Sequence, residues 1–170
     1  MILVVADTGP IHYLVLIEAI GLLPRLYDLV VLPKAVHAEL THPNAPAPVK
    51  SWAAKLPPWV QVKAASHIAL GNLLDPGEAE AIVLAQELHA DSLLLDEKEG
   101  RQEALRLGLP VSGTIGVLEK AAERKMISLS EAFARLSRTN FHIAPEVLQQ
   151  ALQREVSRSR AMQRGRKINP

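Results

Sequence analysis

The chain contains no cysteine among its 170 residues. It therefore forms no disulfide bond and binds no metal through thiolate, so any metal ion must be held by carboxylate, imidazole or backbone oxygen atoms. The six histidines show no spacing that would let two of them share a metal, and we expect structural or surface roles for them. Carboxylates are the remaining candidates.

Aromatic residues are also scarce, at 4% of the chain, which argues against extensive platforms for stacking nucleic-acid bases. The chain also has no large excess of either charge, because 19 basic and 18 acidic side chains leave a net charge of +1. The bulk charge therefore favours no class of partner. The C-terminal tail differs, and two interpretations stay open for it: a solvated helix end or a phosphate-binding segment. Its basic residues, set against the single acid Glu155, are Arg154, Arg158, Arg160, Arg164, Arg166 and Lys167.

Long apolar runs are absent too. Glu18 and Pro24 interrupt the longest apolar stretch, and Asp7 interrupts the first, so we expect neither a membrane span nor a secretory signal. A cytoplasmic location fits this pattern. The segment "DTGPIH" lacks the glycines of a phosphate-binding loop, which argues against a nucleotide-binding α/β domain.

What the sequence does contain is an alternation of strand and helix patterns in a chain that is 48% hydrophobic and 22% charged. Such alternation predicts an α/β domain with a parallel sheet and helices on both faces. The predicted strands are residues 2–6, 29–33, 59–62, 92–96 and 109–113. The predicted helices are residues 11–23, 33–40, 49–55, 76–89, 97–108, 114–126, 128–138 and 144–156.

Acidic residues lie where several of these elements begin or end. Asp7 and Asp96 each follow an apolar strand, Glu39 is near a helix end, and Glu78 completes a capping box begun by Asp75. Each acid alone is explained by helix capping or solvation. Together they lie near the sheet edge at which α/β proteins bind ligands, and their oxygens suit Mg²⁺ or Mn²⁺. This set indicates a metal-dependent phosphodiesterase.

Five segments, in this order, resemble the PIN-domain superfamily: "VVADTGPI", "VLPKAVHAEL", "LDPGEAEAIVLA", "LLLDEKEGRQEALRLGLPVSGTIGVL" and "KMISLSEAFARL". More narrowly, they are similar to a bacterial and archaeal PIN-like subfamily of unknown function that is discussed beside VapC-like toxins. The resemblance covers residues 1–150, and we assign residues 151–170 to the end of a C-terminal helix and its basic tail. It implies a three-layer α/β/α fold with a central parallel sheet and Mg²⁺- or Mn²⁺-dependent cleavage of single-stranded RNA.

The resemblance also implies residue roles. It places the catalytic and metal-binding acids at Asp7, Glu39, Glu78 and Asp96. A hydroxyl group near the site would come from Thr8 or Thr114. The segment "GTIGVL" departs from the "TxD" ending of other branches, so the transfer is weakest there.

Two choices stay open. Glu80 competes with Glu78 for the third acidic position, and residues two apart on a helix do not share a face. We favour Glu78 because it lies in the first helical turn, with Glu80 acting through a water. Arg101 either neutralises substrate phosphate or pairs with Glu97 along its helix.

The sequence thus predicts a metal-dependent endoribonuclease. The resemblance further implies the toxin of a toxin–antitoxin pair, a small antitoxin protein as partner, and a homodimer. The alternative is a non-catalytic PIN-like module that binds RNA or protein.

Overall fold

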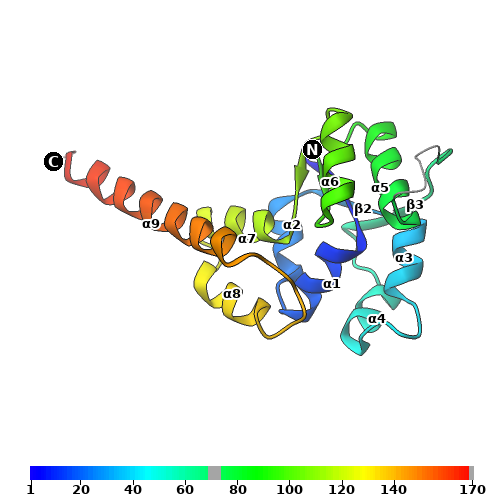
Figure 1. Cartoon of the computed structure of the whole chain (residues 1–170), viewed down its shortest axis with the longest axis horizontal. Coiled ribbons are helices and arrows are strands. Elements are labelled where there is room, and N and C mark those ends of the chain that lie inside the picture. Colours follow the sequence, from blue (N-terminus) through cyan, green and yellow to red (C-terminus); the bar gives the residue numbers. More distant parts are fainter. Residues whose placement is uncertain (69–73, 169–170) are drawn as a thin grey trace. The chain divides into compact units, whose positions relative to one another are not determined.

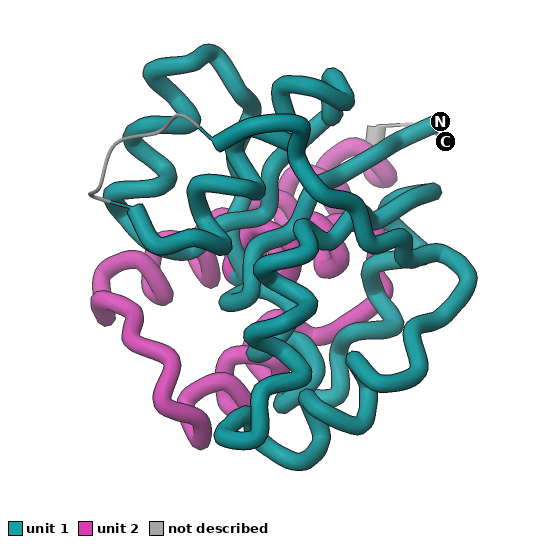
Figure 2. Tube along the Cα trace, turned by 90° about the vertical axis from the view of Figure 1, so that its right-hand side faces the viewer, with its two compact units in different colours: residues 1–114 teal, residues 115–170 magenta. Residues whose placement is uncertain are grey.

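A computed structural model describes residues 1–68 and 74–168 of the chain. The chain divides into two compact units, Met1–Thr114 and Ile115–Pro170 (Figure 2). The expected boundary between residues 150 and 151 falls inside the last helix. The end of the predicted basic tail, residues 169–170, lies outside the described residues.

The first unit is built on a five-stranded sheet with the order β3-β2-β1-β4-β5. All neighbouring strands pair in parallel. The predicted α/β class with a central parallel sheet is confirmed, and helices flank the sheet (Figure 1). The strands are β1 (Leu3–Ala6), β2 (Leu29–Pro33), β3 (Val60–Lys63), β4 (Ser92–Leu94) and β5 (Val111–Ser112).

Helices connect successive strands, as parallel pairing requires. Those of the first unit are α1 (Thr8–Leu16), η1 (Ile20–Leu22, a 3₁₀ helix), α2 (Leu23–Leu26), α3 (Lys34–Leu40), α4 (Ala47–Ala54), α5 (Pro76–Glu87) and α6 (Lys98–Arg106). Helix α7 (Thr114–Glu123) begins at the end of this unit. The second unit continues with α8 (Leu129–Leu136) and α9 (Pro145–Ile168).

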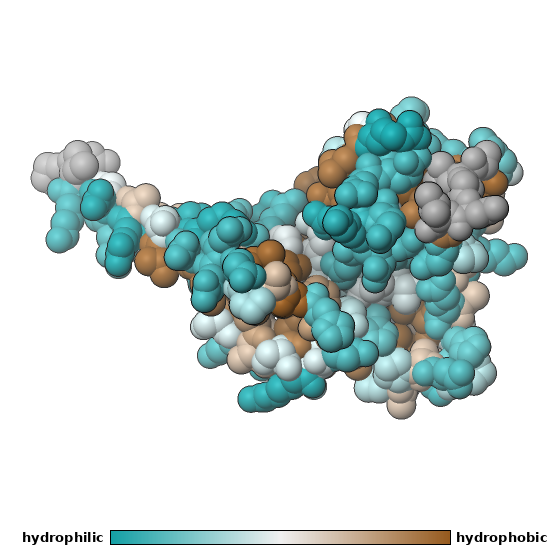
Figure 3. Space-filling view, viewed as in Figure 1, coloured by the Kyte–Doolittle hydropathy of each residue, from teal (hydrophilic) through white to brown (hydrophobic). Residues whose placement is uncertain are grey.

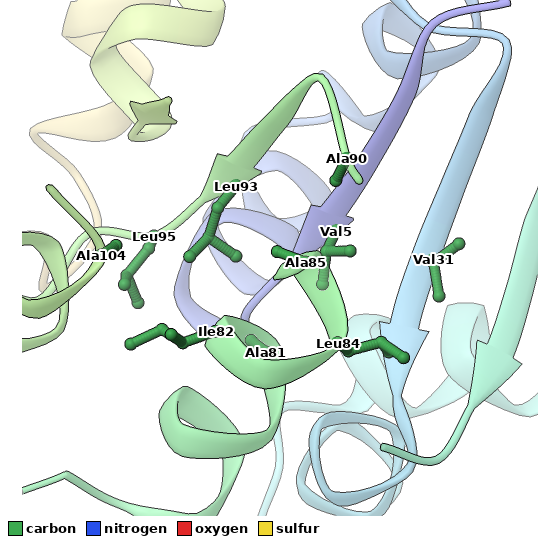
Figure 4. Close-up of a cluster of buried hydrophobic side chains, with 10 residues drawn as sticks. All are labelled: Val5, Val31, Ala81, Ile82, Leu84, Ala85, Ala90, Leu93, Leu95 and Ala104. Atoms are coloured by element: carbon green, nitrogen blue, oxygen red, sulfur yellow. The ribbon is translucent and has the colours of Figure 1, made fainter. Parts of the chain in front are cut away.

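Helix α5 packs against the sheet through small and branched apolar residues. Ile82 and Leu84 of α5 join Val5 of β1 and Leu93 of β4 in one buried cluster (Figure 4). The middle strands are apolar without alternation because both of their faces are covered. This core fixes the start of α5 relative to the strand ends, where the acidic residues lie.

Two helix predictions were wrong in their extent. The predicted helix over residues 11–23 breaks after α1, because Glu18 adopts a left-handed backbone with φ of 59°. There the Glu18 and Ala19 amides bond back to the carbonyls of Val15 and Leu14, which ends the helix in the usual way. The last helix does not fade near residue 156 but runs on through the basic tail to Ile168.

Apolar side chains from all three helices of the second unit are buried, among them Leu118 of α7, Phe133 of α8 and Ala151 of α9, and polar contacts lie at the helix surfaces. Ser128 caps α8 by accepting a hydrogen bond from the Glu131 amide, as the sequence predicted. Arg154 of α9 pairs with Glu119 of α7 at 2.8 Å.

Within residues 1–68 and 74–168, no single helix is long and apolar enough to cross a membrane, although the bent pair Thr8–Leu16 and Ile20–Leu26 passes on length and composition alone.

Candidate functional site

The strand order places Asp7 at the point where the sheet's connections change direction. Strand β1 pairs with β2 on one side and with β4 on the other. The Asp7 amide extends the second pairing by donating to the Leu94 carbonyl at 2.9 Å. In open α/β sheets the crevice beyond such a switch point is where ligands bind.

The Asp7 side chain is buried and poorly satisfied. The residue is 5% exposed. Its Oδ1 atom has no hydrogen-bond partner in the described part of the chain. Burial raises the pKa of Asp7 to about 8, the Thr8 amide opposes this rise, and nearby carboxylates add to it, those of Asp75, Glu78 and Glu39. A buried carboxyl with a free oxygen among other acids is set up to receive a cation or a proton.

Carboxyl oxygens converge around the backbone of Gly77, at the start of α5. A Cβ atom added there would lie 2.8 Å from Glu39 Oε1, 3.3 Å from Asp7 Oδ1 and 3.4 Å from Asp75 Oδ1. Acids from the end of β1, from α3 and from the cap of α5 thus face the same position. The site needs glycine at this position because any side chain would occupy the space that the carboxylates share.

Glu39 is held toward this point by Thr8. It lies in the last turn of α3 and is solvent-exposed, and its Oε2 accepts a hydrogen bond from Thr8 Oγ1. Thr8 opens α1, directly after Asp7. One threonine therefore orients the second acid beside the first.

Glu78 lies in the first turn of α5, inside the predicted capping box. The Glu78 amide donates to Asp75 Oδ1 at 2.9 Å, and the Asp75 amide donates to Glu78 Oε2 at 3.3 Å. Burial, followed by the charge of Asp75, raises the pKa of Glu78 to about 7. Glu78 therefore caps α5 and also lies among the acidic residues near the carboxyl end of the sheet.

Asp96, just beyond β4, is held by a different set of contacts. Its Oδ1 accepts from the Thr114 amide and its Oδ2 from Thr114 Oγ1, both at 2.7 Å. Burial raises the pKa of Asp96, whereas the Thr114 hydrogen bonds and Arg101 oppose that rise. A Cβ on Gly113 would lie 2.6 Å from Asp96 Oδ1 and 2.9 Å from Arg101 Nη1. Asp96 is thus bonded to the amide and hydroxyl of Thr114 and lies within the electrostatic influence of Arg101.

Arg101 also donates to the Leu95 carbonyl at 2.9 Å. This bond turns its guanidinium toward the strand end and Asp96. Among the ion pairs found in residues 1–68 and 74–168, none joins Arg101 to Glu97.

Glu80 makes different hydrogen bonds from Glu78. Its Oε2 accepts from the Ala35 amide at 2.7 Å and its Oε1 from the Ala65 amide at 3.1 Å. Both oxygens of this buried carboxylate are engaged by backbone. Glu80 thereby ties the start of α3 and the segment after β3 to α5.

A hard divalent cation prefers carboxylate oxygens as its ligands. The described side chains, however, are not already arranged around a metal-binding position. Within the described ranges, no group of three or more histidine, aspartate or glutamate side chains is arranged to hold a metal ion. Glu39 and Asp96 instead bond to threonines, and Glu78 bonds to the cap of its own helix. The free oxygen of Asp7 and the all-carboxylate chemistry nevertheless fit Mg²⁺ or Mn²⁺.

Sequence reasoning missed two features of this edge. The sequence pattern indicates only a helix cap at Asp75, yet its Oδ1 faces the same Gly77 position as oxygens of Asp7 and Glu39. The available signal was that Asp75, like Asp7, is the N-cap residue of a helix. The close approach of Gly77 and Gly113 to carboxylates was invisible, because it depends on contacts between distant segments.

Fold and site together define a parallel α/β domain with an acidic site at the carboxyl edge of its sheet. Residues 3–157 match the PIN domain family, and the chain belongs to that family. PIN domains are generally nucleases and typically use divalent metals. The resemblance seen in the sequence motifs is confirmed.

Among solved structures, the chain is similar to a PilT N-terminus domain protein from the hyperthermophilic archaeon Sulfolobus solfataricus P2. The two share 21% sequence identity with a TM-score of 0.49, over 84% of this chain and 100% of the other. No curated protein matches the chain.

Proposed function

We propose that this PIN domain is a metal-dependent endoribonuclease that cleaves phosphodiester bonds of single-stranded RNA. The observation that carries the proposal is the convergence of Asp7, Glu39 and Asp75 oxygens around Gly77. Carboxylates crowded at a ligand-binding edge repel one another, and a divalent cation offsets that repulsion.

The cation would be Mg²⁺ or Mn²⁺, held by Asp7, Glu39, Glu78 and Asp96. When bound, it supplies an activated water and charge neutralisation at the phosphate. Thr8 and Thr114 orient Glu39 and Asp96 through their hydroxyl groups. Arg101, next to Asp96, supplies positive charge for a substrate phosphate.

The alternative function is a non-catalytic module that binds RNA or protein. It is favoured by one observation, namely that the described acidic side chains do not already form a metal-holding group. The two functions differ in whether covalent cleavage depends on Asp7.

The deciding experiment incubates the purified full chain with a mixed pool of single-stranded RNA and Mg²⁺ or Mn²⁺. We expect cleavage that EDTA abolishes. Asp7→Asn keeps the size of the side chain but removes the charge, and we expect its cleavage rate to fall at least about 100-fold. Glu146→Gln, which neutralises an exposed acid of α9, serves as the matched control.

Equal cleavage by Asp7→Asn and the parent chain would rule out this catalytic assignment. RNA binding without cleavage in either protein would favour the non-catalytic module. The finer proposal, a toxin neutralised by a small antitoxin protein, predicts that expression of the parent chain arrests growth and that Asp7→Asn does not. Because relatives of this kind are expected to form homodimers, light scattering of the purified chain tests that part of the proposal.

A further inference from the structure

One face of α9, which we call its inner face, is in contact with other residues of the second unit. Ala151 is fully buried on this face. Arg154 donates to both oxygens of Glu119, at 2.8 and 3.1 Å, and Arg158 pairs with Glu123 at 3.2 Å. The spacing of three and four residues puts Ala151, Arg154 and Arg158 on one side of the helix. These two arginines are therefore already neutralised by acids of α7.

Three further basic residues lie on another side of α9. Arg160, Arg164 and Lys167 are all exposed and are separated by four and three residues, so they also form a single stripe. At 3.6 residues per turn this stripe lies roughly 150° around the helix from the inner face. We call Arg160, Arg164 and Lys167 the basic stripe.

The charges of the basic stripe have no acidic counterpart on their own helix segment, because Glu155 is the last acid of the chain. The ion pairs found in the described part of the molecule include Arg154 and Arg158 but no member of the stripe. In Figure 1 the distal part of α9 continues past α7 and α8, and Figure 3 shows hydrophilic residues interspersed with apolar ones along it.

Uncharged polar side chains continue the stripe toward the start of the helix. Gln153 and Ser157 precede Arg160 at spacings of four and three residues and are exposed. From Gln153 to Lys167 the polar row is roughly 20 Å long at 1.5 Å per residue. Amides and hydroxyls followed by guanidinium groups are the donors that contact nucleic-acid backbones.

We propose that the basic stripe of α9 binds the phosphate backbone of single-stranded RNA. The proposal rests on the proposed function, because it assigns a contact surface for the same substrate class. An acidic protein is the less suitable partner, since the centres of protein interfaces are typically apolar and aromatic whereas this row is charged and polar. A backbone contact of this kind is independent of sequence and weakens as salt rises.

The test measures binding without cleavage. A fluorescein-labelled 20-nucleotide RNA of mixed sequence is titrated with the full chain in EDTA, at several NaCl concentrations, and followed by anisotropy. The stripe variant carries Arg160→Gln, Arg164→Gln and Lys167→Gln. We expect its affinity to fall about tenfold near 0.1 M salt, and the slope of log affinity against log salt to shrink by about 2.

A matched control removes the same charge elsewhere on the second unit. Arg124→Gln, Lys125→Gln and Arg138→Gln together neutralise three exposed bases that lie outside α9. We expect this variant to keep the parent affinity and salt slope. Circular dichroism establishes that both variants retain the parent helix content.

The possible outcomes separate this proposal from the nuclease assignment. Unchanged RNA affinity in the stripe variant, an equal loss in the control variant, or tighter binding of poly-L-glutamate than of RNA would each overturn the stripe proposal. If the parent chain cleaves RNA while the stripe variant binds like the parent, the nuclease stands and the stripe proposal fails. If binding depends on the stripe but no cleavage occurs with Mg²⁺ or Mn²⁺, the reverse holds.

Discussion

At the scale of single residues, Asp7 shows how a buried carboxyl costs stability. Its pKa is raised from 3.8 to about 8 by burial first and by neighbouring acids. Below pH 4 the carboxyl is protonated in both the folded and the unfolded chain. Between pH 4 and pH 8 the unfolded chain ionises more readily, so the folded state loses stability as the pH rises.

We therefore predict that Asp7→Asn stabilises the metal-free protein at pH 8. The gain should be on the order of a few kcal/mol at pH 8 and should vanish near pH 4, because the neutral amide has no charge to desolvate. Thermal melts in EDTA at both pH values measure it. Glu146→Gln, at an exposed acid, should give no such gain, and a destabilised Asp7→Asn protein at pH 8 would contradict the argument.

Glu80 should behave as a structural residue. Glu80→Ala leaves the part-buried amides of Ala35 and Ala65 without their acceptor, at a cost of at most about 1–3 kcal/mol for each. Glu80→Gln keeps one acceptor oxygen and should cost less. Urea unfolding of both variants measures the difference. Equal stability of Glu80→Ala and the parent chain would mean that these two bonds contribute nothing.

A substitution at Gly77 should change the stability of the protein and its cleavage activity in different ways. Alanine is a better helix former than glycine by up to about 1 kcal/mol, so Gly77→Ala should leave stability equal or higher. Its Cβ would stand 2.8 Å from Glu39 Oε1 and displace that exposed side chain, so we expect a loss of metal-dependent cleavage of about tenfold. Gly21→Ala, where nothing lies within 4 Å, should cleave RNA like the parent chain.

At the scale of elements, the sequence predicted what depends on neighbours along the chain. The cap of α5 was readable because Asp75 and Glu78 bond to each other's backbone within one turn. The break after α1 was not readable. Apolar residues continue through it, and a glutamate rather than a glycine adopts the left-handed conformation that ends the helix.

That conformation gives a further prediction. Glu18 has a φ of 59°, which costs a residue with a Cβ roughly 1 kcal/mol more than it costs glycine. Glu18→Gly should stabilise the protein by about that amount in urea unfolding. The opposite change, Gly108→Ala at a φ of 76°, should destabilise it by a similar amount, and the pair of results tests whether backbone conformation is the cause.

At the scale of the whole molecule, alternation of strands and helices predicted a parallel sheet but not its order. The order depends on pairings such as Val4 with Ser92, which no local pattern reveals. That pairing creates the switch point at Asp7 and determines which acids become neighbours. The sequence could therefore nominate Asp7, Glu39, Glu78 and Asp96 one by one. It could not show that an Asp75 oxygen lies near that of Asp7, or that Thr114 donates to both oxygens of Asp96.

The final prediction concerns the binding of a divalent cation by the whole folded chain. A cation that binds only the folded state stabilises it by RT ln(1 + [L]/Kd), about 2.7 kcal/mol at 100 times Kd. Protons compete for the same oxygens, because the pKa of Asp7 is about 8 and that of Glu78 is about 7. The rise in melting temperature on adding Mn²⁺ should therefore be larger at pH 8 than at pH 6, and Asp7→Asn should remove it. An equal rise in the Asp7→Asn protein would place the bound cation away from the Asp7 edge.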